Sequence, residues 1–453
     1  MPMLGHLLLP EIQELVEQRN YRLLKETLLE IPAADLADMV EDLEQSEFVV
    51  VFRLLPKHLA TDVFEYLELE HQKMLLEQLR GHRVQELMKD MSPDDRTALL
   101  EELPTKAANR LMMMLPREER DVARTLLNYP EESVGRVMTP DFVYLLPTMT
   151  VADALTKIRI LGINRETVYD LYVVDDNMAI LGYVSLANLV TASLEVAIRD
   201  LMAENVITIS AMKDQEEAVD MLSRYDLAAL PVVDLDERLI GIVTFDDILD
   251  IVEEEYTEDV HLQAAVQPLE SSYLKIDALS LVKSRVPWLI ILLVAETLGV
   301  FLLRRYDDFL EATIALALFL PVMIATGGNT GTQSAALVIR AMATGDLRLK
   351  DGFTVLAREL LVSALLSSIL GIISFGLVLG MEGDFGIALC IGVGLATIVT
   401  LSNLMGVMLP LLLQALRYDP ALMSGPFIST VIDVVGLVIY LEISRYILLH
   451  VLV

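Results

Sequence analysis

Long uncharged stretches in the C-terminal part of the chain limit its fold most strongly. Residues 385–416 form a run of 32 positions without Asp, Glu, Lys or Arg, and residues 360–380 form another of 21. A helix needs about 20 residues to cross the hydrocarbon core of a bilayer, so such runs are too long for ordinary buried helices. We predict five membrane-spanning helices, near 285–303, 312–343, 356–380, 385–416 and 426–450.

Charge divides the chain into two parts of different character. The whole chain has 34 Lys+Arg and 66 Asp+Glu; residues 276–453 hold 10 and 13 of these, which leaves 24 and 53 in residues 1–275. The first part therefore carries a net charge of −29 and the second −3. This acidic front excludes nucleic acid as the main partner, because phosphate binding needs a basic surface. It points to cations instead, and the single cysteine, Cys390, excludes an intramolecular disulfide.

Residues 1–132 repeat a pattern of proline followed by a short amphipathic run. Successive prolines are spaced by 24, 37, 11 and 12 residues, close to multiples of 12, at Pro32, Pro56, Pro93, Pro104 and Pro116. Proline is tolerated in the first turn of a helix, where its missing N–H makes no intrahelical bond. The pattern predicts an all-α superhelical domain in which neighbouring helices bury one another's apolar faces.

Residues 134–252 contain a second, different repeat. The segment 137–140 (VMTP) corresponds to 201–204 (LMAE), 172–175 (YVVD) to 231–234 (PVVD), and 182–185 (GYVS) to 241–244 (GIVT), with five extra residues in the first copy near 160–169. Each copy predicts a helix, a buried strand, a turn, a second strand and a closing helix.

This repeat resembles a tandem pair of CBS domains, with α/β copies at 133–199 and 200–252. The resemblance rests on GIVTFDD at 241–247, which is close to the family's Gly-x-x-Thr/Ser-x-x-Asp pattern. It implies an adenine nucleotide such as ATP as a modulator, with Thr244 and Asp247 as ribose or phosphate ligands. The first copy has Ser185 and Asn188 at these positions and departs from the pattern. The alternative is that both copies are structural spacers.

An acidic amphipathic segment leads from the repeat to the membrane part, and we place a connecting helix and linker at 253–277. Its carboxylates are dense and include no Lys or Arg neighbour: Asp246, Asp247, Asp250, Glu253, Glu254, Glu255, Glu258 and Asp259. Like charges at i,i+3 and i,i+4 destabilise a helix, so a cation is expected to offset them. Oxygen ligands without a His or Cys pattern favour a hard ion, Mg²⁺ or Ca²⁺.

The predicted pore domain, 278–453, contains two polar features. In the second span, Pro321, Gly327, Gly328 and Gly331 predict a broken helix with exposed carbonyls beside the polar side chain of Asn329. In the fifth, Asp433 is surrounded by apolar residues, and an intramembrane carboxylate is a candidate functional group. Glu296 in the first span is a second candidate and is expected to pair with Arg340 or another polar group.

Together, TGGNTGTQS, YDPALMSGP, TVIDVVGLVIY and the order of domains resemble the MgtE family of magnesium transporters over almost the full chain. The resemblance implies a homodimer in the bilayer whose spans two and five line a pore on the two-fold axis. Asp433 falls on the family's pore carboxylate, and Ser429, Gly327, Gly328 and Asn329 are expected to shape the cavity. Gly425 stands where an Asn is expected before the proline.

The resemblance also implies that cytoplasmic Mg²⁺ closes the pore by bridging acidic faces of the N-domain, CBS pair and connecting helix. The expected regulatory ligands are Asp94, Asp95, Asp214, Glu216, Asp226, Asp246, Asp247, Asp250, Glu254, Glu255, Glu258, Asp259 and Asp419. Asp247 can serve metal or ribose.

The expected fold is thus a multidomain chain with a superhelical N-domain, a CBS pair and five transmembrane helices. We expect it in the cell (inner) membrane, with the N-terminal domains cytoplasmic and the C-terminus outside. We expect no enzymatic activity, because no nucleophile and base constellation is present. The alternatives are a broader Co²⁺/Mn²⁺ transporter, an exporter, or a membrane-anchored nucleotide sensor.

Overall fold

The chain forms two compact units. The structure is a computed structural model that describes residues 4–162, 167–269, 273, 276–422 and 425–450. One unit comprises Met1–Glu253 and the other Glu254–Val453. Helix α15 (Phe245–Gln263) crosses the boundary, so its first residues belong to one unit and the rest to the other.

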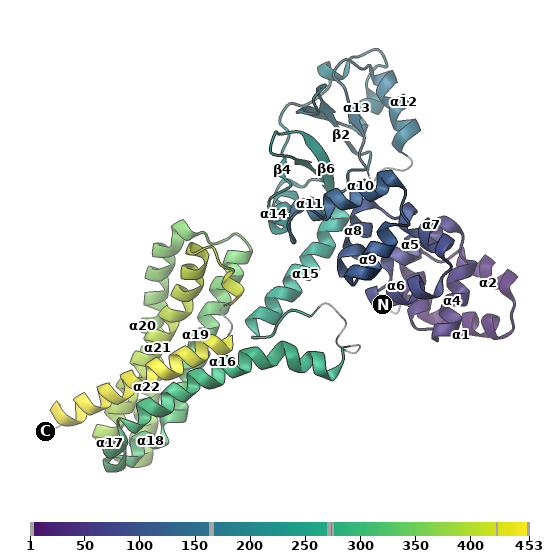
Figure 1. Ribbon diagram of the computed structural model, residues 1–453. Coiled ribbons are helices and arrows are strands. Elements are labelled where there is room, and N and C mark those ends of the chain that lie inside the picture. The colour runs from purple at the N-terminus through teal and green to yellow at the C-terminus, as the bar shows by residue number, and fades with distance from the viewer. Residues whose placement is uncertain (1–3, 163–166, 270–272, 274–275, 423–424, 451–453) are drawn as a thin grey trace. The chain divides into compact units, whose positions relative to one another are not determined.

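Short helices build the N-terminal part of the first unit, seen in purple and blue in Figure 1. Four of the predicted prolines are N-cap residues, and Pro93 is the first residue of its helix. The described helices are α1 (Leu4–Glu17), α2 (Tyr21–Leu28), α3 (Ala33–Glu41), α4 (Gln45–Leu54), α5 (Lys57–Tyr66), α6 (Leu69–Gln78), α7 (Gly81–Asp90), α8 (Pro93–Glu102), α9 (Thr105–Met112) and α10 (Arg117–Leu126).

These helices share one continuous apolar core. Helix α5 shows the pattern, because it buries Ala60, Val63 and Phe64 at positions i, i+3 and i+4, which lie on one face. The buried apolar side chains of α1 to α9, together with Ala123 of α10, belong to a single cluster that runs from one helix to the next. Each short helix is therefore stabilised by its neighbours rather than by its own length.

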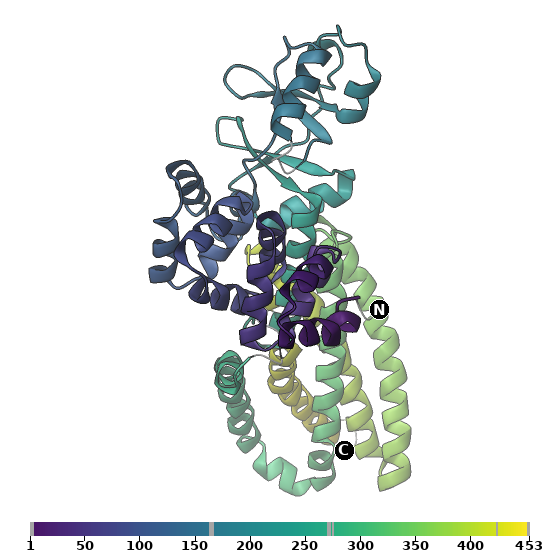
Figure 2. The same ribbon diagram turned by 90° about the vertical axis from the view of Figure 1, so that its right-hand side faces the viewer.

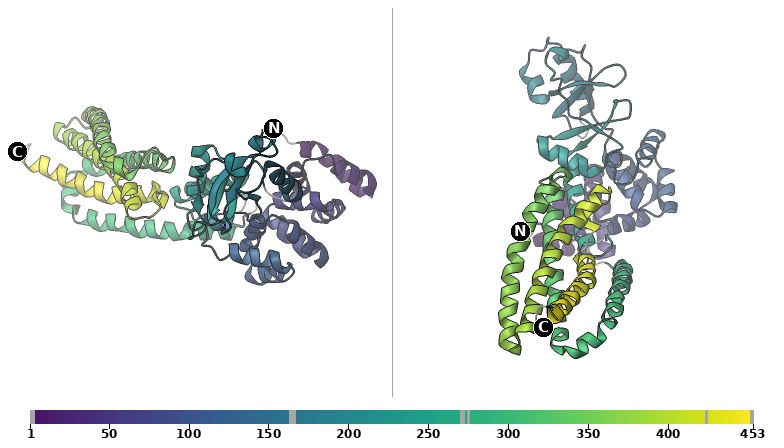
Figure 3. Two further views of the ribbon diagram at one scale, coloured as in Figure 1. Left: turned by 90° about the horizontal axis from the view of Figure 1, so that it is seen from above. Right: turned by 90° about the vertical axis from the view of Figure 1, so that its left-hand side faces the viewer.

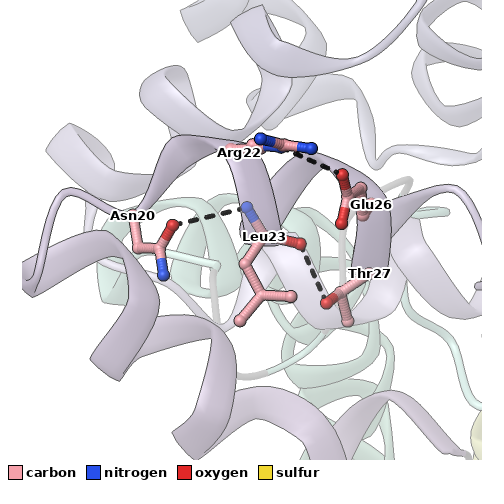
Figure 4. A network of polar contacts seen from close by, with 5 residues as sticks. All are labelled: Asn20, Arg22, Leu23, Glu26 and Thr27. Atoms are coloured by element: carbon pink, nitrogen blue, oxygen red, sulfur yellow. Dashed lines mark hydrogen bonds and ion pairs between the residues drawn. The ribbon is translucent and has the colours of Figure 1, made fainter.

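Side-chain hydrogen bonds add to this packing where a helix begins. At the start of α2, Oδ1 of Asn20 accepts a hydrogen bond from the backbone N–H of Leu23 at 3.4 Å, as Figure 4 shows. Further along the same helix, Arg22 pairs with Glu26 at 3.4 Å and the Thr27 hydroxyl donates to the Leu23 carbonyl at 3.1 Å. Such caps satisfy N–H groups that have no intrahelical partner.

Two small sheets make up the rest of the first unit (Figure 2). Each has three strands, in which the first pairs parallel and the third antiparallel to the middle strand. The first copy contains α11 (Val134–Val137), β1 (Tyr144–Leu145), α12 (Val151–Leu161), β2 (Asp170–Val174), β3 (Ile180–Ser185) and α13 (Leu186–Thr191). The second contains β4 (Ile209–Ser210), α14 (Gln215–Tyr225), β5 (Ala229–Val233), β6 (Leu239–Thr244) and the start of α15.

The predicted order of helix, strand, turn, strand and helix is confirmed in both copies, and the two-residue strands β1 and β4 were not predicted. The five extra residues predicted near 160–169 fall partly on 163–166, which lie outside the described residues.

The two copies exchange the segments that precede their first strands. Thr139 forms a β-bridge with Ile242 of the other copy, and Tyr183 forms one with Ala203. At both crossings a glycine makes the close approach possible: a Cβ on Gly241 would lie 2.7 Å from the sulfur of Met138, and one on Gly182 would lie 2.6 Å from the Ala203 carbonyl. The repeat in the sequence is therefore a two-fold repeat in the packing.

Long helices build the second unit, and α20 and α21 run side by side (Figures 1 and 3). Four described helices are long and apolar enough to cross a membrane, namely α16, α20, α21 and α22. The bounds are α16 (Ala278–Arg304), α17 (Asp307–Ala312), α18 (Ile314–Leu318), α19 (Leu320–Ala343), α20 (Gly352–Glu382), α21 (Phe385–Ala415) and α22 (Gly425–His450). The remaining predicted span, at 312–343, stays a prediction. This stretch contains the last residue of α17 and the whole of α18 and α19.

The predicted break in the second span is wrong. Helix α19 is continuous through Gly327, Gly328 and Gly331, and Pro321 lies in its first turn, where no hydrogen bond is lost. The glycines instead let other helices approach closely. A Cβ on Gly327 would lie 2.6 Å from Cγ2 of Ile398 in α21, and one on Gly331 would overlap Ile432 in α22.

Candidate functional site

Polar residues gather where α19 packs against α22. A Cβ on Gly328 would overlap the hydroxyl of Ser429, so the missing side chain makes room for that hydroxyl at the helix contact. The next residue, Asn329, is exposed on the single chain. Gly328 and Ser429, two of the predicted pore residues, therefore meet at this contact, while Gly327 packs against Ile398 of α21 and Ile432 of α22.

Asp433 lies one turn further along α22 from Ser429, on the same face because the two are four residues apart. Its side chain is half-buried, and its Oδ1 is buried without a hydrogen-bond partner among the described residues. The neighbouring charged group is Glu296 of α16, whose carboxyl interacts with that of Asp433. The expected pairing of Glu296 with another polar group therefore falls on Asp433 rather than on Arg340.

A buried polar network that the sequence analysis missed links three helices of the same unit. Nδ2 of Asn403 in α21 donates to a carboxylate oxygen of Glu359 in α20 at 2.9 Å, and the Ser334 hydroxyl of α19 donates to Oδ1 of Asn403. Asn403 is almost fully buried. The sequence feature that could have indicated this network is the amide of Asn403 within the uncharged run 385–416. Polar groups inside a membrane segment are energetically costly and usually paired. The network holds α19 in register with its neighbours.

In the first unit, carboxylates from α8 and α15 lie close together, and we call them the α8–α15 cluster: Asp95, Asp246, Asp247 and Asp250. Burial raises the pKa of Asp247 to about 6, and hydrogen bonds from Thr244 oppose this rise while Asp246 and Asp95 add to it. The pKa of Asp250 is raised first by burial and then by Asp95. Burial likewise raises that of Asp95, although the side chain keeps an exposed surface. The cluster is thus crowded and negatively charged, with desolvation its largest cost.

The candidate nucleotide residues are bonded to each other. Oδ2 of Asp247 accepts hydrogen bonds from the Thr244 hydroxyl at 2.5 Å and from its backbone N–H at 3.2 Å. Thr244 precedes the first residue of α15, and Asp247 is the third, so this is the N3-to-N-cap half of a capping box. One carboxylate therefore both begins α15 and belongs to the α8–α15 cluster.

A second group of carboxylates lies in the other unit, and we call it the α15–α22 cluster: Glu255, Asp259 and Asp419. Burial raises the pKa of Asp259 to about 6, Asp419 and Glu255 raise it further, and Arg340 opposes them. Asp419 accepts a hydrogen bond from the Ala421 N–H at 2.8 Å, and burial raises its pKa as well. Asp419 precedes α22, the helix that carries Asp433.

Other predicted ligands are placed apart from these clusters. Asp214 is the N-cap of α14, where it accepts from the Glu216 N–H at 3.0 Å, whereas Asp226 is the C-cap at the opposite end of that helix. Asp94 is buried, and its charge acts on the guanidinium of Arg96. Of the remaining predicted ligands, Glu254 is exposed and Glu258 half-buried on α15.

The comparisons with known proteins match three successive parts of the chain. The family model MgtE, described as a divalent cation transporter, matches residues 320–443. The MgtE intracellular N domain matches 31–132, and the CBS domain matches 134–195 and 198–254. These matches cover Asp433, Asp419 and the α8–α15 cluster, whereas Glu255, Glu258, Asp259 and Glu296 fall between the second CBS match and the transporter match.

Full-length relatives agree with these matches. The chain is 37% identical to the magnesium transporter MgtE of Thermus thermophilus over 96% of this chain and 98% of the relative. It is 30% identical to that of Bacillus subtilis over 90% and 93%. The crystal structure of the cytosolic domain of the Mg²⁺ channel MgtE in complex with ATP has a TM-score of 0.52 and 33% identity, over 54% of this chain and 99% of that one. The relatives are named as transporters rather than enzymes, and this chain belongs to the MgtE family.

Proposed function

We propose that the protein is a Mg²⁺-selective channel for magnesium uptake. The observation that carries the proposal is Asp433, a carboxylate with a buried oxygen on an apolar helix, one turn from the contact of Ser429 with Gly328. The magnesium transporters that resemble the chain over nearly its whole length support the choice of ion.

The proposed pore is formed by two copies of the chain. In a two-fold symmetric dimer, Asp433 becomes a pair of facing carboxylates, which a divalent cation neutralises and a monovalent cation only half neutralises. Mg²⁺ gives up its water reluctantly, so the carboxylates and nearby hydroxyls would hold it through its hydration shell. The N-terminal domains would be cytoplasmic and the C-terminus outside, with uptake driven by about 2.3 kcal/mol per charge per 100 mV.

Cytoplasmic Mg²⁺ would close this pore by binding the two carboxylate clusters. Two carboxylates about 4 Å apart repel by about 4 kcal/mol at an effective dielectric of 20. Relief of a few such repulsions reaches the ~5.5 kcal/mol that moves a two-state equilibrium from 1:99 to 99:1. Helix α15 contributes carboxylates to both clusters, so bound ions would hold it in the closed state.

An adenine nucleotide is proposed as a modulator at the CBS pair. The support is the solved relative in complex with ATP and the Thr244–Asp247 pair at the end of β6. Because Asp247 also belongs to the α8–α15 cluster, nucleotide and Mg²⁺ would influence each other's affinity. ATP titration by calorimetry, at low and at high Mg²⁺, tests this coupling.

The deciding experiment measures Mg²⁺ uptake by the full chain in proteoliposomes. Asp433→Asn is expected to reduce flux by about a hundredfold, which corresponds to about 2.8 kcal/mol. The control Asp308→Asn, at an exposed position in α17, should leave flux unchanged. Normal flux in a folded Asp433→Asn protein would overturn the pore proposal. Equal competition by Co²⁺ or Mn²⁺ would indicate a broader transporter.

A further inference from the structure

A third group of metal-ligating side chains lies within the N-terminal helices, away from both carboxylate clusters in the sequence. It consists of Glu41, the last residue of α3, Glu68, the N-cap of α6, and His71 in the first turn of α6 (α6 is labelled in Figure 1). One ligand atom from each residue lies within 4.8 Å of the others. We call these residues the α3–α6 triad.

The local structure positions all three side chains. Glu68 and His71 are three residues apart, so they lie on one face at the start of α6. Oε1 of Glu41 accepts a hydrogen bond from the Glu68 backbone N–H at 2.7 Å, which brings the end of α3 to the start of α6. The imidazole packs edge-on against Phe48 at 5.5 Å between ring centroids, which limits its rotation. The triad is therefore formed by the fold and not by one flexible segment.

The imidazole nitrogen is aimed at a carboxylate. Nδ1 of His71 lies 3.1 Å from Oε1 of Glu41, with only 19% and 16% of the two side chains exposed. The same Nδ1 is buried and makes no hydrogen bond with any residue that the structure describes. The 3.1 Å approach to Glu41 therefore lacks hydrogen-bond geometry, and a metal ion bound to both atoms would satisfy the nitrogen and the carboxylate oxygen together. Glu68 is exposed and leaves the group accessible from solvent.

We propose that the α3–α6 triad binds a divalent transition-metal ion, with Zn²⁺ as the ion to test. Imidazole nitrogen suits Zn²⁺, Co²⁺ and Ni²⁺, whereas Mg²⁺ prefers oxygen ligands and keeps most of its water. One nitrogen and two carboxylate oxygens leave a coordination position for water, as in other three-ligand zinc sites. The acidic N-terminal part would then carry two kinds of metal site, one of them insensitive to Mg²⁺.

The test uses the purified full chain in detergent with millimolar Mg²⁺ present, so that all-oxygen sites are filled. Co²⁺ replaces Zn²⁺ as a probe because its visible absorption reports nitrogen ligation and low coordination number. We expect one Co²⁺ per chain, displaced by Zn²⁺ and not by additional Mg²⁺. His71→Ala and Glu68→Gln should each weaken Co²⁺ binding by at least about tenfold, which corresponds to about 1.4 kcal/mol.

Matched variants separate this site from surface binding. His58→Ala and Glu70→Gln remove an exposed histidine of α5 and an exposed carboxylate of α6, and both should bind Co²⁺ as the parent does. Glu68→Gln is at an exposed position, so it keeps the proposal testable if His71→Ala does not fold. Co²⁺ binding unchanged in Glu68→Gln, or displacement of Co²⁺ by Mg²⁺, would overturn the proposal, and either result would leave the pore proposal untouched.

Discussion

The α8–α15 cluster and the Asp433 site present carboxylates in opposite ways. In the cluster, four carboxylates from two helices crowd together within one chain, and desolvation and repulsion between carboxylates raise the pKa values of Asp95, Asp247 and Asp250. At the Asp433 site a single chain offers one carboxylate beside Glu296, on a helix contact made close by Gly328. The first arrangement gathers four carboxylates whose repulsion an ion can relieve, and the second holds a pair of carboxylates from two helices, one of them one turn from a close helix contact. This difference suits a sensor and a pathway respectively.

The largest expected effect concerns the contact between Gly328 and Ser429, one turn of α22 away from Asp433. Gly328→Val should separate α19 from α22, since a side chain there overlaps Ser429, and should cost about 1–3 kcal/mol of stability by overpacking. Thermal unfolding in detergent measures this loss, and flux should fall with it. Gly376→Val in α20 is the matched control, because a Cβ there meets nothing within 4 Å. Equal unfolding temperatures for the two variants would show that the Asp433 site does not depend on a close helix contact at Gly328.

The next effect concerns the α8–α15 cluster. Asp95→Asn removes the charge that α8 brings to Asp247 and Asp250, so one ligand for the ion is lost. The Mg²⁺ concentration that half-protects α15 from protease should rise about tenfold, or about 1.4 kcal/mol. Asp62→Asn, at an exposed position in α5, should not shift it. An unshifted titration in Asp95→Asn would mean that the cluster is not a sensor.

Protons should act on the cluster in the same direction as Mg²⁺. The pKa of Asp247 is raised to about 6 in the folded state from its ordinary value of 3.8, so between these pH values the folded state holds a proton that the unfolded state releases. Stability that depends on this group is therefore present at low pH and is lost as pH rises towards about 6. In chelator, the protection of residues 245–253 against hydrogen exchange, after correction for the pH dependence of intrinsic exchange, should be greater near about pH 4 than above about pH 6. Equal or lower protection at the lower pH would contradict this.

The smallest effect concerns the start of α15. Thr244→Val removes the hydroxyl bond to Asp247 and should cost about 1 kcal/mol, as loss of a cap does. Thr150→Val breaks a similar Thr–Asp capping box on α12 and should cost about as much. Only Thr244→Val should also change the Mg²⁺ dependence of protease protection. If both variants changed it equally, the second role of Asp247 would be refuted.

The sequence predicted the parts of this molecule that depend on local pattern. Helix starts at the prolines and the two longer strands of each copy follow from spacing and from hydrophobic period, as does the amphipathic character of the acidic helix after the second copy. It did not predict contacts between distant helices. The reading of Gly327, Gly328 and Gly331 as helix breakers was wrong because glycine serves close packing equally well, and only the neighbours Ile398, Ser429 and Ile432 distinguish the two.

Polar contacts between residues far apart in the sequence could not be predicted either. Glu359 and Asn403 are 44 positions apart, and Glu41 and His71 are 30 apart. Neither pair forms a spacing pattern, so nothing in the sequence alone brings their polar atoms together. The acidic residues of α14 illustrate the converse, because Asp214 and Asp226 are near in sequence and yet occupy opposite ends of one helix.

The hydrogen bonds at the start of α15 determine how Asp247 can coordinate an ion. Its Oδ2 already accepts two hydrogen bonds from Thr244, so Oδ1 would be the oxygen offered to a metal. In the proposed site such a carboxylate would be a monodentate ligand. Ca²⁺ is often held by carboxylates that offer both oxygens, whereas Mg²⁺ requires an octahedron of single contacts at short distance. In the proposed site, Asp247 would thereby disfavour the larger ion through the number of oxygens that it can offer.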